Sequence, residues 1–453
     1  MDSSLILKLG KRKRRMRAEK DRLSRLPEYL IDSILERVPV EDAVRTSVLS
    51  RNWRYRWTRM RSLILDEHFS EKLARNGGAF GYNGFIRITN QLFNFLEGPI
   101  LNVHLHIPKN MVVDNFQEVN QWIFSLSRKH NGVRELVLTN SNKVPYQLPS
   151  YLFHCSELRK LHLKNCIFKP PSPFDDLNNG FPHLNDLSLS NITFEANLGE
   201  TVFELPGLEK LELSLCTNVC NFNIKATKLK SLTVEGCHDV KFIRLLDSQR
   251  LTDVHLFITE PIPIPRFEER VNLATMLSNL PYLVSLSADG CFLKYSVGEK
   301  IPKWLPCAAA ANRLLHRLYF IDCNFGQLDQ IQGALLLLRN SPNLELLIVM
   351  NVCLDRQHLH LDVKPALAYL EASFDCFNQT LNRLKTIKIR RLAGTRALLL
   401  LIKLLLDRSP NLELILIEPS ITADDHEKDK FFKDVRHFPR ASSKAKLRFV
   451  DLL

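Results

Sequence analysis

Glycine is scarce in this chain, with 16 glycines among 453 residues. Glycine lets a backbone approach a ligand closely, so the shortage argues against many contacts of that kind. The sequence also lacks the Gly-x-x-x-x-Gly-Lys phosphate loop, the Gly-x-Ser-x-Gly nucleophile turn and the His-Glu-x-x-His zinc motif. The one glycine-rich stretch, Gly77 to Gly84, lacks the spacing of a dinucleotide loop, and we interpret it as a flexible connection. We therefore expect no catalytic residues and no enzymatic activity.

Long hydrophobic runs are missing as well. The longest strongly apolar run, Ala397 to Leu406, is short and contains Lys403, so it cannot span a bilayer. Near the N-terminus the few aliphatic residues precede the positive charges, which is the wrong order for a secretory signal. Without a route into an oxidising compartment, the ten cysteines are expected to be thiols rather than disulfides. We predict no contact with a membrane.

Positive charge is in excess but unevenly placed. The chain has 62 basic and 49 acidic residues, a net charge of +13, and residues 1–22 alone hold nine basic side chains against three acids. The cluster from Lys11 to Arg15 is typical of a nuclear-import signal, although a solvated disordered leader has the same composition. We expect a location in the nucleus, the cytoplasm or both. Direct binding of nucleic acid is not expected, because the rest of the chain is only mildly basic.

Residues 23–66 have the pattern of a small helical module. Apolar residues recur at helical spacing from Leu26 to Val38, and Pro39 ends that helix. A second helix is expected to bury Val48 and Leu49, and Trp53 and Trp57 are four residues apart, as on one face of a helix. A unit of about 40 residues buries too little core alone. It therefore either caps the structure that follows or offers its remaining apolar surface to a partner.

The rest of the chain repeats the leucine-rich template L-x-x-L-x-L-x-x-N/C. Its second leucine position recurs every 21 to 26 residues as far as Val254, and the next intervals lengthen to 32, 32 and 29. Each unit cannot bury its own apolar face, so the units must stack. We predict an α/β fold, a horseshoe solenoid with a concave parallel sheet and a convex side of helices and loops, with longer connections late in the chain. The expected strand positions are Leu136, Leu161, Leu187, Leu211, Leu232, Val254, Leu286, Leu318, Leu347, Ile387 and Ile415, with earlier strands at Leu63–Leu65 and Val103–Leu105.

Cysteine falls repeatedly at one template position just past the strand. A small buried thiol packs well at such a turn, whereas a zinc site needs paired ligands a few residues apart. His104 and His106 alternate on an expected strand and are interpreted as surface residues. We therefore predict no metal and no cofactor. The five template cysteines are Cys166, Cys216, Cys237, Cys291 and Cys323.

Residues 23–66 resemble the F-box motif, through Leu26-Pro27-Glu28, Ile31, Ile34-Leu35, Val38-Pro39, the run Arg45-Thr46-Ser47-Val48-Leu49-Ser50-Arg51-Asn52-Trp53-Arg54, and Trp57. Near the C-terminus a strand at 384–389, a helix at 397–406 and Ser409-Pro410-Asn411-Leu412-Glu413 before another strand resemble the FBD region. Most of the chain thus resembles plant F-box/FBD/leucine-rich-repeat proteins. The resemblance implies a basic leader at 1–22, a three-helix F-box at 23–66, a solenoid at 67–380 and FBD-like repeats with a cap at 381–453.

The resemblance further implies the substrate-recognition subunit of a Skp1–cullin–F-box (SCF) ubiquitin ligase. The F-box would bind the Skp1-like adaptor, and through it a cullin, while the repeats would bind a target protein. The expected adaptor-binding residues are Leu26, Pro27, Leu30, Ile31, Ile34, Leu35, Val38, Pro39, Val48, Leu49, Trp53 and Trp57, although Trp57 could instead face the first repeat strand. Two alternatives remain open, a leucine-rich-repeat scaffold or nuclear regulator outside any ligase, and a nucleic-acid binder acting through the leader.

A candidate target-binding surface follows from strand alternation. Residues that alternate with the buried leucines point to the concave face, and these are polar in the early repeats. In the later repeats they become apolar, which is typical of a binding surface unless a loop or the C-terminal tail covers them. The candidate residues are Tyr319, Ile321, Leu346, Ile348 and Met350.

Overall fold

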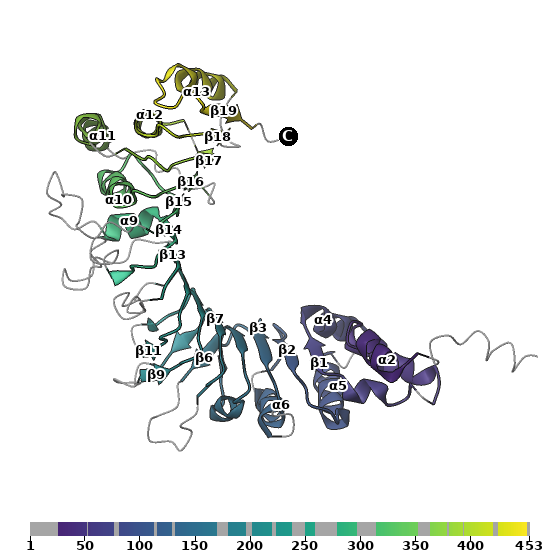
Figure 1. The fold of residues 1–453 in the computed structure, drawn as a ribbon. Coiled ribbons are helices and arrows are strands. Elements are labelled where there is room, and N and C mark those ends of the chain that lie inside the picture. Colours follow the sequence, from purple (N-terminus) through teal and green to yellow (C-terminus); the bar gives the residue numbers. More distant parts are fainter. Residues whose placement is uncertain are drawn as a thin grey trace, which may run out of the picture. The chain divides into compact units, whose positions relative to one another are not determined.

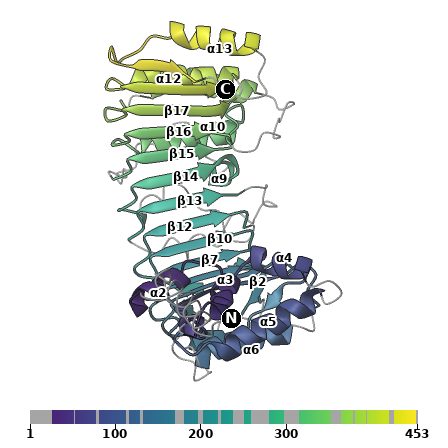
Figure 2. The same cartoon turned by 90° about the vertical axis from the view of Figure 1, so that its right-hand side faces the viewer.

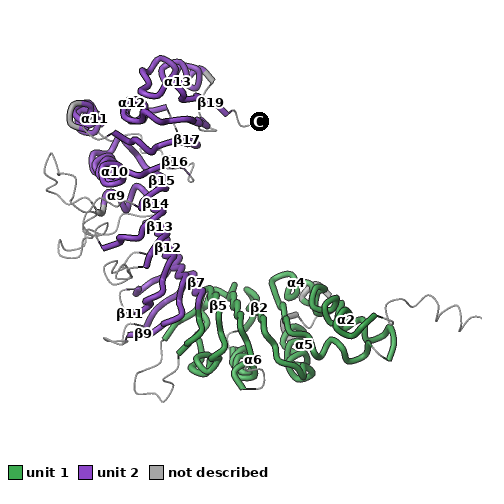
Figure 3. The backbone as a smooth tube through the Cα atoms, in the orientation of Figure 1, with its two compact units in different colours: residues 1–184 green, residues 185–453 purple. Residues whose placement is uncertain are grey.

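The computed structural model describes residues 26–51, 53–76, 81–112, 116–128, 132–169, 180–195, 202–219, 223–237, 250–258, 279–296, 314–351, 363–377, 380–392, 394–419 and 425–450. The chain divides into two compact units, residues 1–184 and 185–453 (Figure 3). The predicted leader at 1–22 lies outside the described residues.

Unit 1 has two short helices at its start, and longer helices connect the first strands of its parallel sheet. The helices are α2 (Glu28–Leu35), α3 (Val40–Arg45), α4 (Glu67–Asn76), α5 (Gly81–Phe95) and α6 (Phe116–Arg128), with 3₁₀ turns at Thr46–Val48, Arg56–Arg59 and Ser150–His154. The sheet strands are β1 (Ser62–Leu65), β2 (Asn102–Ile107), β3 (Glu135–Asn140) and β5 (Lys160–Lys164), each parallel to the next. A short pair, β4 (Tyr146–Gln147) and β6 (Cys166–Phe168), lies beside them.

Unit 2 continues the repeat with ten parallel strands among its described residues. These are β7 (Asp186–Ser190), β10 (Lys210–Ser214), β12 (Ser231–Glu235), β13 (Asp253–Phe257), β14 (Ser285–Asp289), β15 (Arg317–Ile321), β16 (Leu346–Met350), β17 (Thr386–Leu392), β18 (Leu414–Pro419) and β19 (Lys446–Phe449). Short strands β8 (Thr193–Phe194), β9 (Val202–Glu204) and β11 (Asn223–Lys225) accompany the early repeats. From β14 onward the connections are helical: α9 (Gly290–Ser296), α10 (Leu328–Arg339), α11 (Lys364–Cys376), α12 (Arg396–Arg408) and α13 (Asp425–His437).

The helices α9 to α12 of unit 2 lie on one side of its sheet, and the edge-on view shows the other face free of helices (Figure 1). Figure 2 is turned by 90° so that the helix-free face of unit 2 is toward the viewer, and it shows the strands of that unit stacked in sequence order. Successive helices pack against one another, α9 on α10, α10 on α11, α11 on α12 and α12 on α13. The predicted longer connections after Val254 are thus confirmed, as is the α/β repeat fold of each unit.

The template leucines form the core, as predicted. Leu211 pairs in register with Leu187 and Leu232, and Leu213 pairs with Leu189 and Val234, so each position becomes a continuous buried row. Burying one such side chain stabilises the fold by about 1.5–3 kcal/mol. The strands expected at Leu63–Leu65 and Val103–Leu105 are β1 and β2, and both pairs of side chains are buried.

A left-handed residue follows the strand in several repeats. Asn165, Asn191, Leu215, Gly236 and Asp322 all have φ between 47° and 60°. The turn redirects the chain away from the strand, and the backbone N–H of Leu215 still bonds the carbonyl of Glu235 at 2.7 Å. Asparagine and glycine suit this conformation, whereas leucine adopts it only when its neighbours fix it.

Four of the five template cysteines are buried, as predicted, whereas Cys291 is half-buried within helix α9. Cys216 Sγ donates to the carbonyl oxygen of Leu189 at 3.3 Å, and the Cys216 N–H donates to Cys237 Sγ, also at 3.3 Å. Burial raises the pKa of the Cys166 and Cys323 thiols and raises that of Cys155 to about 12. The thiolate is the reactive form, so these thiols are inert packing groups.

Three local predictions are wrong. Gly81 and Gly84 lie within α5, so this part of the glycine-rich stretch is helical; Gly77 and Gly78 lie outside the described residues. The third helix of the expected three-helix module is absent from its described residues, where Arg56–Arg59 forms only a 3₁₀ turn. His106 is buried rather than on the surface. Its buried ring has polar partners, because Ser70 Oγ lies 2.9 Å from Nδ1 and Ser141 Oγ lies 2.9 Å from Nε2. Burial lowers the pKa of His106 and so favours the neutral ring.

The C-terminal elements match their predictions. The expected strand at 384–389 is β17, the apolar helix is α12, and the strand after Ser409-Pro410 is β18. Thr395 caps α12 by accepting a hydrogen bond from the Leu398 N–H at 3.3 Å. Arg408 sits in the last turn, where a cation is favourable.

Candidate functional site

The N-terminal module divides its apolar residues between a core and a surface. Ile31 and Leu35 point inward from α2, and Trp53 and Trp57 are only 3% and 7% exposed. These four residues were predicted to contact an adaptor, and the structure buries them within the chain. A unit of this size can form only a small core, and these four side chains are part of it.

Trp57 joins the module to the first repeat. Its ring packs edge-on against Phe95 of α5, with centroids 6.2 Å apart. Lys72 of α4 also pairs with Glu41 of α3 at 2.9 Å. The alternative was that Trp57 faces the first repeat strand, around Leu63; the structure places its ring against helix α5.

The remaining apolar residues of the module face outward. Val48 is 88% exposed and Leu49 is 61% exposed, although sequence reasoning placed both on a buried face. They leave the core because Thr46–Val48 is a tight 3₁₀ turn rather than a continuation of α3. Leu30 and Ile34, one turn apart on α2, are also exposed, as are Pro27 and Pro39, while Leu26 and Val38 are half-buried.

Ion pairs and hydrogen bonds hold this exposed surface in place. Arg56 Nη2 lies 2.9 Å from Glu28 Oε1, and Arg56 Nη1 lies 3.8 Å from Asp32, which ties α2 to the second 3₁₀ turn. Ser47 Oγ donates to the carbonyl oxygen of Arg54 at 2.9 Å and braces the loop that carries Val48 and Leu49. These contacts connect α2, the loop that carries Val48 and Leu49, and the second 3₁₀ turn.

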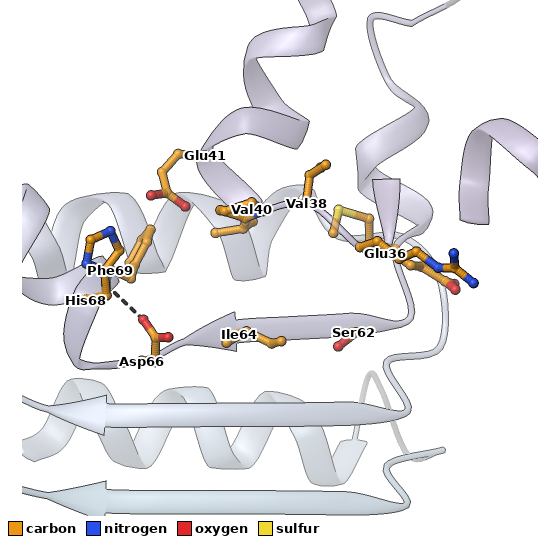
Figure 4. Close-up of a pocket in the computed structure, with 12 residues that line it drawn as sticks. Glu36, Val38, Val40, Glu41, Ser62, Ile64, Asp66, His68 and Phe69 are labelled. Carbon is orange, nitrogen blue, oxygen red and sulfur yellow. Dashed lines mark hydrogen bonds between the residues drawn. The ribbon is translucent and has the colours of Figure 1, made fainter. Parts of the chain in front are cut away.

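A cavity of about 240 Å³ lies between the turn that joins α2 to α3, strand β1 and the start of α4 (Figure 4). Val38, Val40 and Phe69 contribute apolar walls, and two of its acids, Glu41 and Asp66, have partners within the fold. Glu41 pairs with Lys72, and Asp66 Oδ1 accepts a hydrogen bond from the Phe69 N–H at 2.9 Å. We interpret the cavity as the packing seam between module and sheet, because these carboxylates are engaged in structural contacts.

The candidate target-binding residues lie on the face of unit 2 that carries no helices. Tyr319, Leu346, Ile348 and Met350 are half-buried, whereas Ile321 is buried at 9% exposure. Tyr319 pairs in register with Ile348, and Ile321 with Met350, so β15 and β16 bring them together. The structure thus places four of the five at an accessible surface and one in a less accessible position than predicted.

Among the described residues, no group of three or more histidine, cysteine or acidic side chains is arranged to hold a metal ion. No helix in the described part of the chain is long and apolar enough to span a bilayer.

Comparison with known proteins agrees with this geometry. The F-box domain model matches residues 23–65, and the model for the leucine-rich repeats of FBD-associated F-box protein At5g56370 matches residues 119–288. F-box/FBD/LRR-repeat protein At1g13570 of Arabidopsis thaliana is 30% identical over 445 residues, covering 95% of this chain and 98% of the relative. The chain belongs to the F-box/FBD/LRR-repeat family.

Other proteins are similar over different shares of the chain. Putative F-box protein At3g44060 of Arabidopsis thaliana is 25% identical and covers 94% of this chain and 99% of the relative. A solved LRR protein of Leptospira interrogans covers 80% of this chain and 92% of that chain at 14% identity, with a TM-score of 0.31. A TM-score this low does not bear on how the repeats are arranged.

Membership of the F-box/FBD/LRR-repeat family implies a general role. Such proteins act as adaptors that bring a substrate to an SCF ubiquitin ligase, and they are generally not catalytic. Within this F-box, Leu30, Ile34, Val48 and Leu49 form the accessible apolar surface, whereas Trp53 and Trp57 are buried. Sequence spacing alone could not separate the two sets, because both follow a helical period.

Proposed function

We propose that this protein is the substrate-recognition subunit of an SCF ubiquitin ligase, with its F-box bound to a Skp1-like adaptor and its repeats bound to a target protein. The observation that carries the proposal is the exposed pair Val48 and Leu49 on a braced loop of an F-box whose tryptophans are buried. Neighbouring large apolar side chains that are exposed to solvent are typical of a surface that a partner covers.

The chain's own contribution to ubiquitination would be proximity. Binding the adaptor at one end and a target at the repeats converts a bimolecular encounter into one at a high effective concentration. The chemistry of ubiquitin transfer belongs to other subunits, so no catalytic group is needed here.

The test is reconstitution from purified components. The full chain, co-expressed with a Skp1-like adaptor, should elute with it as one complex of equal stoichiometry and should then recruit a cullin. Elution of the folded chain without the adaptor, over a range of adaptor concentrations, would contradict the proposal.

A nuclear location is proposed from residues 1–22, which carry a net charge of +6 from nine basic and three acidic side chains. Deleting these residues should shift a fluorescent fusion from the nucleus to the cytoplasm, because import receptors recognise compact basic clusters. Adaptor capture should be unchanged, since the F-box begins after the deletion. An unchanged distribution in cell imaging would remove the import signal and leave a solvated leader.

A further inference from the structure

The charged residues on the helix-free face of unit 2 are sorted by sign along the sheet. In β7 to β13, the positions that alternate with the buried rows hold four acids, Asp186, Glu212, Glu235 and Asp253, against one lysine, Lys210. In β15 to β19 the same positions hold five basic residues, Arg317, Lys388, Arg390, Lys446 and Arg448, against one acid, Glu418. The face is therefore acidic at one end and basic at the other.

Strand β14 separates the two ends. Its face residues Ser285, Ser287 and Asp289 are buried, and Asp289 Oδ1 is engaged in accepting the Phe292 N–H at 2.7 Å. Arg317 of β15 lies 3.3 Å from Asp253 of β13, so this ion pair bridges β14. On the β13 side of this ion pair the face is mainly acidic, and on the β15 side it is mainly basic.

The basic end keeps a positive excess after its internal contacts are made. Glu418 lies 3.8 Å from Nε of both Arg390 and Arg391, so one carboxylate is shared between two guanidinium groups. Lys446 and Arg448 are exposed on β19, and Lys388 is half-buried on β17. These cations can attract an acidic partner over several ångströms at physiological ionic strength.

The apolar residues of the face gather at the same basic end. Across the strands, one row reads Tyr319, Ile348, Lys388, Leu416 and Arg448 in register, so three large apolar side chains lie in one row with two basic ones. Neighbouring strands are about 4.8 Å apart, so this row spans about 19 Å over four spacings. That length is crossed by about six extended residues or about thirteen helical ones.

We infer that the face of β15 to β19 binds a segment of the target protein that presents acidic and large apolar side chains together on one face. This inference rests on the proposed role of the repeats in target binding. Burial of apolar side chains against Tyr319, Ile348 and Leu416 supplies affinity. Carboxylates of the segment pair with Lys388, Arg390 and Arg448 and set its orientation.

The same surface is poorly suited to nucleic acid. A phosphate backbone gains little from the half-buried aliphatic side chains that lie between the cations, and it would meet the acids of β7 to β13 if it continued along the face. A protein segment uses both features of the patch, because it can present apolar and acidic side chains on the same face.

The experiment uses the full chain co-purified with its adaptor as bait for a random library of displayed peptides of about fifteen residues, enough to cross the patch as a helix. Enriched peptides should be acidic and contain at least two large apolar residues. Synthetic copies of them should bind at least about tenfold more weakly to the double variant Lys388→Glu, Arg390→Glu, because attraction becomes repulsion. The exposed single variant Arg448→Glu should also weaken binding and does not disturb a half-buried position.

The matched control reverses two exposed lysines on α13, Lys430→Glu and Lys433→Glu, which makes the same change in net charge away from this face. It should leave peptide affinity unchanged. Enrichment of basic or uncharged peptides, no enrichment at all, displacement of the peptides by a single-stranded oligonucleotide, or equal affinity in the Arg448→Glu variant would overturn the inference. Adaptor co-purification is read in the same preparation, so loss of the adaptor would count against the proposed function, and a wrong peptide class only against this inference.

Discussion

Replacing Leu49 with aspartate should abolish adaptor capture while the protein stays folded. Leu49 is 61% exposed and adjoins Val48 on the same braced loop, so the change costs little in the free protein. At an interface it removes about 1.5–3 kcal/mol of apolar burial and adds the cost of desolvating a carboxylate. A combined loss of more than about 3 kcal/mol is over a hundredfold in Kd. Titration of the purified variant with a Skp1-like adaptor measures it.

The matched control for Leu49→Asp is Val202→Asp. Val202 lies in β9 of unit 2 and is 53% exposed, so it receives the same new charge on a surface outside the F-box. Adaptor affinity should be unchanged in this control. Circular dichroism of both variants separates loss of contact from loss of fold. Full adaptor affinity in folded Leu49→Asp would show that the adaptor binds elsewhere on the module.

Aspartate at Val349 should unfold unit 2, whereas aspartate at the preceding residue, Ile348, should leave it folded. Val349 is 1% exposed and lies in register between Phe320 and Ile389, so its replacement buries a carboxylate in the leucine row. Losing the valine and desolvating the charge costs about 4 kcal/mol or more, a large part of the 5–15 kcal/mol that stabilises a typical domain. Ile348 is half-buried on the opposite face, where a polar replacement costs about 1 kcal/mol.

Urea unfolding of the two variants, followed by far-ultraviolet circular dichroism, measures this difference. The Ile348→Asp protein, and likewise Met350→Asp, should retain adaptor capture and lose target binding. Comparable destabilisation by Ile348→Asp and Val349→Asp would mean that the apolar patch is core and would remove the candidate target-binding surface.

The repeat architecture was predictable because the spacing of the leucines defines where each strand lies. A strand position is defined by two leucines separated by one residue, and the period fixes how many residues remain for the return connection. The F-box was harder to predict, because Ile31 and Ile34 are both apolar on α2 and only packing decides that Ile31 is core and Ile34 surface. The exposure of Val48 and Leu49 depends on a 3₁₀ turn that replaces the expected helix, and helical periodicity does not report such a turn.

Some conformations are set by position in the repeat rather than by residue type. Leu215 and Arg391 have φ of 54° and 56°, although neither residue favours the left-handed region. Their equivalents Asn165 and Asn191 would have indicated the turn, but the leucine and the arginine adopt it because the strands on both sides are already paired.

The change from extended to helical connections within unit 2 has a consequence for its curvature. Packed helices need about 8–10 Å between axes, whereas neighbouring strands need about 4.8 Å. Where α9 to α13 follow the strands, the helical side must therefore be longer than the strand side, and the sheet must bend around its free face. The early repeats, with short strands β8, β9 and β11 in place of helices, have no such difference in spacing. The acidic end should accordingly be the straighter part of the sheet, and the basic end should form a concave arc that can surround part of a ligand.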